Sequence, residues 1–204
     1  LAEVKEVNIN ENFLSADHTE RLLSYFGIRQ ESWGRSCNKI TLVPSPQPVL
    51  GREIKIPNDI SLAAPALVEA ALAAEGSKKF ENLLINPKRL GFLYTLKYMG
   101  ADLKIKNRRY WGYEAVADIV VGSNATLTGV VVPEKITLTM LKEMPALLLA
   151  AARAEGLSSF YGLCDYHSEL LPEAKAAVAE IKPLGVTINC DKEKLDIGKK
   201  NLIR

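Results

Sequence analysis

Two segments of this 204-residue chain align without a gap, residue 145 against residue 65 and residue 156 against residue 76, an offset of 80 residues. Their sequences are PALVEAALAAEG and PALLLAAARAEG. Both are rich in alanine and leucine, have no wide polar face and end on a glycine, which is typical of a helix enclosed by other elements. A repeat at this spacing is too long for one turn of a solenoid, so it indicates a duplicated subdomain.

The residues around the two segments also repeat in kind. We predict a helix within 56–76 that is capped by Asn58, Asp59 or Ser61 and stops at Gly76. Further predicted elements are strands at 79–85 and 159–164, helices ending at Gly100 and Gly185 (the first opened by Pro87), and extended runs at 101–105 and 186–190. The predicted fold class is therefore α/β, with tandem βαβαββ units over about 52–121 and 127–197.

The first 48 residues have a different pattern. We predict a strand within 1–13 and a helix over 21–27, with Ser15 or Asp17 as its cap and Glu20 completing a capping box. A hairpin is expected over 28–33 and 38–43, with Gly34 in its turn, and the proline-rich stretch 44–48 is the expected boundary between residues 1–48 and 49–204. A helix and a hairpin bury little surface, so we expect residues 1–43 to pack apart from the two units or against a neighbouring chain, which would cover Leu22, Leu23 and Phe26.

Composition limits the function classes. The chain has 48% hydrophobic and 25% charged residues and a net charge of +2, which offers no electrostatic argument for nucleic acid or membrane binding. The apolar run at 144–154 is too short to cross a bilayer. Cys37, Cys164 and Cys190 lack metal-ligand spacing and are interpreted as reduced thiols of a cytoplasmic protein. No signal peptide is recognised, and because the chain opens on Leu1 we expect it to be part of a longer polypeptide.

One stretch combines basic and aromatic residues. Lys104, Lys106, Arg108 and Arg109 stand beside Tyr110, Trp111 and Tyr113. This pattern occurs in nucleic-acid-binding surfaces, but it also fits a solvated hairpin between two strands. The near-neutral net charge favours the hairpin, and no nucleic-acid partner is expected.

Four sequence motifs occur in an informative order: SADHTE at 15–20, IPNDISLAA at 56–64, NPKRLG at 86–91 and KYMGAD at 97–102. Together they resemble the enolpyruvyl-shikimate-phosphate synthase (3-phosphoshikimate 1-carboxyvinyltransferase) family over roughly residues 7–200. The resemblance implies the enolpyruvyl transferase fold, with two domains of three βαβαββ units each. It also implies that shikimate 3-phosphate and phosphoenolpyruvate bind between the domains without a metal or organic cofactor. On this map the chain holds the end of the first domain and two of the three units of the second, so the fold is incomplete.

The resemblance also locates the family's functional positions, and five of them are substituted here. Ala16 stands where active members have a substrate-contacting arginine, and Lys142 stands where they have a catalytic aspartate. The family's Lys-Glu-Ser-Asp-Arg motif places its lysine at Glu169, its acid/base glutamate at Leu170 and its arginine at Glu173. No catalytic residue is therefore assigned. Glu143 is not expected to replace the aspartate, because adjacent helix residues face different directions.

The other polar residues near these motifs are interpreted as structural. His18 and His167 are expected to be capping or surface residues, and Asp17 and Thr19 are expected to be caps. Two functions then compete: a piece of a shikimate-pathway transferase that needs its missing parts, or a non-catalytic binding or assembly domain that keeps the fold. Nucleic-acid binding through 104–113 is a third and weaker hypothesis, since related repeat folds occur in RNA-end-processing enzymes. Self-association, or association with a chain that carries the missing domain, is the expected kind of partnership.

Overall fold

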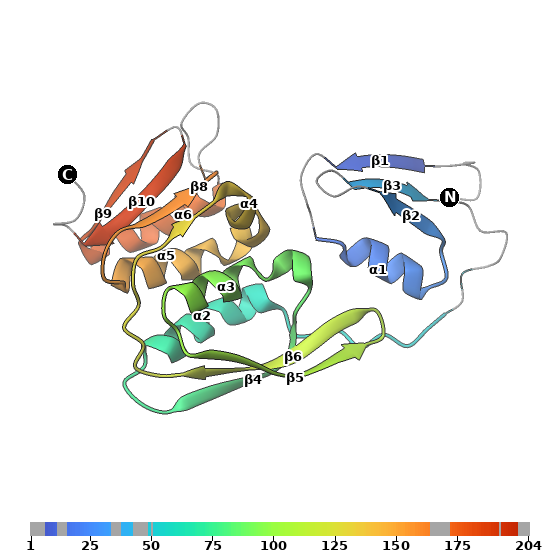
Figure 1. Ribbon diagram of the computed structural model, residues 1–204, viewed down its shortest axis with the longest axis horizontal. Helices are drawn as coiled ribbons and strands as arrows, with labels where there is room; N and C mark the ends of the chain where they lie inside the picture. Colours follow the sequence, from blue (N-terminus) through green and yellow to red (C-terminus); the bar gives the residue numbers. More distant parts are fainter. Residues whose placement is uncertain are drawn as a thin grey trace.

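The computed structural model describes residues 7–11, 16–33, 38–42, 49, 51–163, 172–191 and 193–199. These residues form an N-terminal segment (7–42), a first repeat (58–122) and a second repeat (131–199), which follow one another along the chain (Figure 1). The architecture is mixed α/β. No helix in the described ranges has the length and apolar character that a membrane crossing requires.

The N-terminal segment contains strand β1 (Val7–Glu11), helix α1 (His18–Tyr25), and strands β2 (Gln30–Trp33) and β3 (Asn38–Leu42). The strands form an antiparallel sheet in the order β1-β3-β2. The predicted strand, helix and hairpin are therefore confirmed, although Gly34 lies outside the described residues. The predicted capping box is wrong, because Asp17 precedes α1 but its side chain makes no capping hydrogen bond.

The first repeat begins with a single parallel bridge between Asn58 and Leu83. Its other elements are α2 (Ile60–Leu72), β4 (Ser77–Leu84), the 3-10 turn η1 (Pro87–Arg89), α3 (Gly91–Tyr98), β5 (Leu103–Trp111) and β6 (Glu114–Gly122). The sheet order is β4-β6-β5, with both pairs antiparallel. Residues 104–113 lie in the β5–β6 hairpin, as the favoured interpretation of this basic-aromatic stretch predicted.

The second repeat has the same order of elements. It contains β7 (Val131–Val132), α4 (Glu134–Thr137), the 3-10 helix η2 (Leu138–Glu143), α5 (Met144–Arg153), β8 (Ser158–Tyr161), α6 (Pro172–Ile181), the 3-10 turn η3 (Lys182–Leu184), β9 (Val186–Cys190) and β10 (Lys194–Lys199). Its sheet runs β7-β8-β10-β9, and β7 is parallel to β8, as Asn58 is to Leu83 in the first repeat. The two predicted βαβαββ units are confirmed.

The boundaries of the repeated helices differ from the prediction. Asp59 is the cap of α2 and accepts a hydrogen bond from the Ser61 backbone nitrogen at 2.9 Å. The helix ends at Leu72, so the prediction that it stops at Gly76 is wrong. Gly76 and Gly156, with φ of 92° and 94°, instead make the turn that leads into the next strand, a conformation that glycine adopts without strain. Likewise, Pro87 opens η1, and α3 begins only at Gly91.

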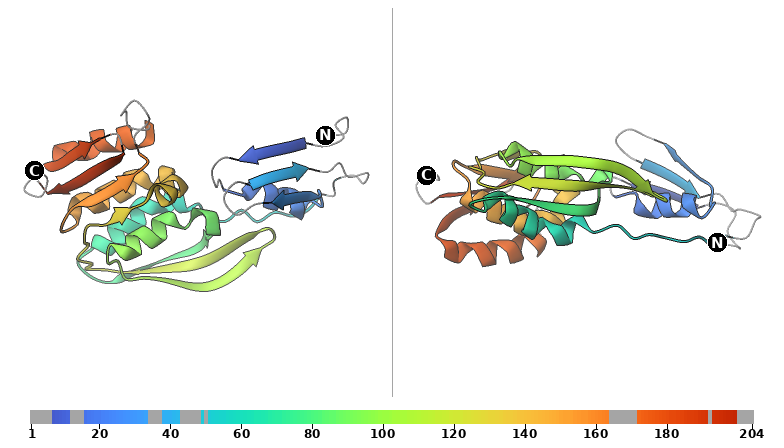
Figure 2. Two further views of the ribbon diagram at one scale, coloured as in Figure 1. Left: turned by 45° about the horizontal axis from the view of Figure 1, so that its top comes forward. Right: turned by 90° about the horizontal axis from the view of Figure 1, so that it is seen from below.

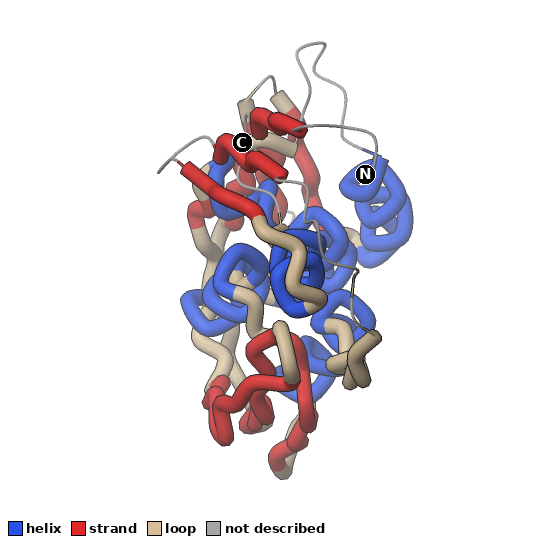
Figure 3. The backbone as a smooth tube through the Cα atoms, turned by 90° about the vertical axis from the view of Figure 1, so that its right-hand side faces the viewer, coloured by secondary structure: helices blue, strands red, loops and turns tan. Residues whose placement is uncertain are grey.

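The helices of the two repeats form a layer between the two sheets (Figures 1 and 3). One hydrophobic cluster runs through both repeats and includes Leu67 and Phe92 from the first and Leu147 and Phe160 from the second, all fully buried. Helices α2 and α5 contact each other within this layer, and both contain buried alanines. The burial confirms that the repeated helix is enclosed rather than laid on the surface.

The N-terminal segment lies beside the first repeat and is joined to it by an extended stretch that includes 51–57 (Figure 2). No side chain of α1 is buried, and Leu22, Leu23 and Phe26 are half-buried.

Cys190 is disulfide-bonded, which corrects the interpretation of all three cysteines as reduced thiols.

Candidate functional site

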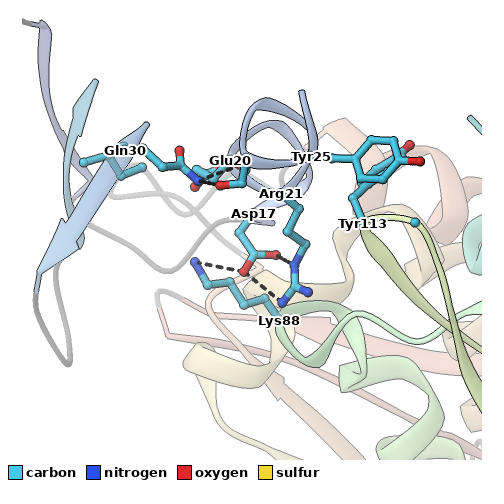
Figure 4. Close-up of a pocket in the computed structure, with 10 residues that line it drawn as sticks. Asp17, Glu20, Arg21, Tyr25, Gln30, Lys88 and Tyr113 are labelled. Carbon is cyan, nitrogen blue, oxygen red and sulfur yellow. Dashed lines mark hydrogen bonds and ion pairs between the residues drawn. The ribbon is translucent and has the colours of Figure 1, made fainter. Parts of the chain in front are cut away.

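The residues around Ala16 form the junction between the N-terminal segment and the first repeat. Ala16 itself is exposed and directly precedes Asp17, whose carboxylate is the centre of the polar contacts (Figure 4). Arg21 donates to Asp17 from Nε at 2.8 Å and from Nη2 at 3.2 Å, and Asn86 donates from Nδ2 at 2.6 Å. Lys88 Nζ lies 3.9 Å from the same carboxylate. Asp17 therefore links α1 to η1 rather than capping its own helix.

The neighbouring donors and cations keep the Asp17 carboxylate ionised. Burial acts to raise its pKa, but the hydrogen bonds from Arg21 and Asn86, with the charges of Arg21 and Lys88, outweigh burial and lower it. The pKa of Arg21 is raised in turn, chiefly by its hydrogen bond to Asp17. Asp17 is thus engaged with two cations and an amide, which makes it unsuitable as a proton carrier.

His18 makes the second contact of the junction. Its Nδ1 lies 2.5 Å from Oε1 of Glu114, the first residue of β6, and the Glu114 side chain is only 2% exposed. The His18 side chain is still 32% exposed, and it contacts Glu114 across the junction. The sequence contained no signal for Glu114, because nothing in a strand's pattern identifies a carboxylate that a helix 96 residues earlier will meet.

A hollow of about 550 Å³ lies along α1 between these contacts and the β5–β6 turn. Its lining residues are Asp17, Glu20, Arg21, Ser24, Tyr25, Gln30, Ile40, Lys88, Gly112 and Tyr113. At its far end the centres of the Tyr25 and Tyr113 rings lie 5.7 Å apart, with the ring planes tilted by 42°. Figure 4 shows the two side chains next to each other. The two cations of this lining, Arg21 and Lys88, both lie beside the Asp17 carboxylate, so the hollow does not offer them freely to a phosphorylated substrate.

The second predicted position, Lys142, lies on η2 and its side chain is exposed. The side chain of the adjacent Glu143 is buried and contacts residues of the first repeat. Ser61 donates a hydrogen bond to Glu143 Oε1 at 2.5 Å, and Arg89 donates from Nη2 at 2.8 Å. Arg89 Nη1 also lies 3.9 Å from Asp59. The carboxylate of Glu143 is therefore committed to a contact between the repeats.

The structure describes the side chains of only two of the five predicted site positions, Ala16 and Lys142. Neither is among the residues that line the 550 Å³ hollow. Glu169 and Leu170 lie outside the described residues, as does His167. Glu173 falls in α6, but its side chain is outside the described part. Among the described residues, no three His, Cys, Asp or Glu side chains are grouped so as to hold a metal ion.

Comparison with known proteins agrees with the fold and the motifs. The sequence model of the EPSP synthase (3-phosphoshikimate 1-carboxyvinyltransferase) family matches residues 1–202. The 3-phosphoshikimate 1-carboxyvinyltransferase of Rhodospirillum rubrum is 32% identical over 200 residues, which cover 97% of this chain and 44% of that protein. The protein of the same name from Desulforudis audaxviator is 36% identical over 180 residues, covering 88% and 41%.

Solved structures show the same relationship. The EPSP synthase from Acinetobacter baumannii superposes with a TM-score of 0.83 at 35% identity, covering 96% of this chain and 43% of that one. The enolpyruvyl transferase NikO from Streptomyces tendae, with a TM-score of 0.61 at 15% identity, shares the fold. The chain spans less than half the length of the relatives it matches. By sequence and by fold, it belongs to the EPSP synthase family.

Proposed function

We propose that this chain represents the end of the first domain (1–48) and two units of the second domain (49–204) of a protein descended from 3-phosphoshikimate 1-carboxyvinyltransferase. By itself it does not transfer enolpyruvyl groups. The observation that carries the proposal is the pair Lys142 and Glu143: a cation stands where the family has an acid, and the neighbouring carboxylate is buried against Arg89 and Ser61.

The chemistry explains why this substitution matters. Addition to and elimination from an enol ether needs a group that carries protons, and each such group contributes roughly a hundred- to ten-thousand-fold in rate. Lys142 cannot supply a carboxylate. Glu143 would have to leave a charge-assisted hydrogen bond to Arg89 and expose a buried side chain before it could reach a substrate. The proton-carrying role of the family's catalytic aspartate is therefore not taken over by Lys142 or Glu143.

Charge at the remaining positions acts in the same direction. Ala16 contributes no cation, and the sequence positions of Glu169 and Glu173 put carboxylates where the family has a lysine and an arginine. A carboxylate a few ångströms from a phosphate opposes binding by about 1–4 kcal/mol per pair. We therefore expect neither shikimate 3-phosphate nor phosphoenolpyruvate to bind measurably at the positions that the family uses.

The alternative function is that of a non-catalytic binding or assembly domain. Retention of the contact between the repeats (Arg89, Glu143, Ser61) and of the junction (Asp17, His18, Glu114) favours it, since both are structural and neither needs the lost catalytic groups. The disulfide at Cys190 argues against a reducing compartment. Alkylation of the protein from cells, followed by mass analysis of Cys190, decides between a reduced and an oxidised environment.

Titration calorimetry with shikimate 3-phosphate, and phosphate release in the presence of phosphoenolpyruvate, test the proposal. We expect no turnover for the chain or for Lys142→Asp, and no binding heat beyond that given by inorganic phosphate alone, because one restored carboxylate does not restore the cations. Micromolar binding of shikimate 3-phosphate by the unmodified chain, abolished by Arg89→Met, would show that the site uses groups that we assign to structure.

A further inference from the structure

A second hollow, of about 320 Å³, lies on the first repeat between helix α3 and strand β5. Its lining residues are Leu93, Tyr94 and Lys97 of α3 and Leu103, Lys104, Ile105 and Arg108 of β5. None of these is acidic, in contrast to the mixed charges of the hollow along α1. Three cations from two different elements therefore surround one small depression.

Two of the three cations are unpaired within the described part of the chain. Lys97 and Arg108 are exposed and have no ion-pair or hydrogen-bond partner among the described residues. Lys104 Nζ lies 3.0 Å from Asp102, but both side chains are 59% exposed. An exposed pair of this kind contributes little, so Lys104 remains available to an incoming anion.

Protection of a sheet edge does not account for this cluster. Strand β5 is at the edge of the order β4-β6-β5, and lysines commonly guard such edges against pairing with another chain. That explanation suits Lys104. It does not suit Lys97, which lies on a helix and still lines the same hollow.

Apolar surface complements the charge. Leu93 and Leu103 are 1% and 4% exposed, and Ile105 is half-buried. The Tyr94 ring, 48% exposed, lines the same hollow. A depression with an apolar base, one aromatic side chain and a few cations matches the usual make-up of a small-ligand site.

We infer that this hollow binds a small organic anion, with its carboxylate or phosphoryl group held by Lys97, Lys104 and Arg108 and a planar apolar body placed against Tyr94 and the leucines. The size of the hollow suits a single ring.

Calorimetry with phenyl phosphate and with inorganic phosphate, at low ionic strength, tests this site. Phenyl phosphate is expected to bind more tightly than inorganic phosphate, because only the former uses the apolar base. Lys97→Gln and Arg108→Gln should each weaken phenyl phosphate by about fivefold, the loss of one exposed charge contact. Tyr94→Ala should weaken phenyl phosphate and leave inorganic phosphate unchanged.

Lys175→Gln, an exposed lysine of α6, is the matched control and should bind as the unmodified protein does. Lys97→Arg should retain binding because it keeps the charge. All these positions are on the surface, and unchanged thermal midpoints would show that the variants fold. Equal weakening by Lys175→Gln, or equal affinity for the two phosphates, would overturn the inference.

Discussion

Arg89 donates a hydrogen bond to Glu143 at 2.8 Å across the boundary between the first and second repeats. The Glu143 side chain is 1% exposed and that of Arg89 is 15% exposed, so the pair is largely removed from water. Ser61 donates to the same carboxylate oxygen from the first turn of α2. One buried carboxylate thus connects η2 of the second repeat with two elements of the first.

Removing Arg89 should therefore destabilise the protein. Arg89→Met leaves Glu143 buried without its cation, and breaking a buried pair on one side costs about 3–5 kcal/mol. Urea unfolding measures the loss. Arg153→Met, at an exposed position, is the control and should stay within about 0.5 kcal/mol of the parent. A similarly small change for Arg89→Met would show that the pair does not hold the repeats together.

Asp118 should make stability depend on pH. Its carboxylate accepts hydrogen bonds from the Asn107 side chain, the Asn82 backbone nitrogen and Arg109. Lys79 Nζ lies 3.1 Å from the same carboxylate. These contacts, with the Asn107 hydrogen bond first, hold the pKa of Asp118 well below its ordinary value. Because the folded-state pKa is depressed, the stabilisation is complete above about pH 5, where the unfolded carboxylate is ionised, and it is lost progressively as pH falls toward the folded-state value.

The matched variant is Asp118→Asn. It should be less stable than the parent at pH 7, and the difference should narrow as denaturant unfolding is repeated from pH 5 to pH 3. The hydrogen bonds of Asp118 also connect the places where β4 and β5 shift register against β6. Asn82 and Asn107 lie at these two places, with φ of 56° and 52°. A constant difference across this pH range would mean that Asp118 acts through packing and not through its charge.

Gly91 should not accept a side chain. A Cβ at this position would collide with the Thr139 hydroxyl and lie 3.1 Å from the Ile136 carbonyl oxygen, both in the second repeat. Overpacking of this kind costs about 1–3 kcal/mol. Gly91→Ala is therefore expected to lower the thermal midpoint. Gly51→Ala, where nothing lies within 4 Å, should leave it unchanged.

Tyr25 should anchor the end of α1 on the first repeat. Its hydroxyl donates to the Glu53 carbonyl at 3.1 Å, Arg52 lies 5.1 Å from its ring centre, and its ring packs close to Gly112. Tyr25→Ala should expose the connecting stretch, so that trypsin cleaves faster after Arg52 and Lys55. Tyr98→Ala, at an 81% exposed side chain, is the control. Equal cleavage rates in both variants would contradict an anchoring role.

The order of elements was predictable from sequence because it depends on local chemistry. Alanine-rich segments, their glycines and the strands that follow recur at a fixed offset, and the βαβαββ order follows from hydrophobic pattern and turn residues alone. Helix ends were less predictable. Gly76 allows a left-handed turn wherever the chain needs one, and the tertiary structure uses it four residues beyond the end of α2.

Polar contacts between distant residues could not be predicted, because local competition among partners decides them. Asp17 and Glu20 have the spacing of a capping box, yet Arg21 and Asn86 offer the Asp17 carboxylate stronger, charge-assisted bonds once α1 meets the first repeat. The sequence by itself determined the repeat and the family, and it predicted that Ala16 and Lys142 stand at substituted functional positions. Only the tertiary structure decided that Glu114 pairs with His18 and that Glu143 accepts a hydrogen bond from Arg89. The reason is that a buried charged group needs a partner, and folding brings that partner from a distant part of the chain.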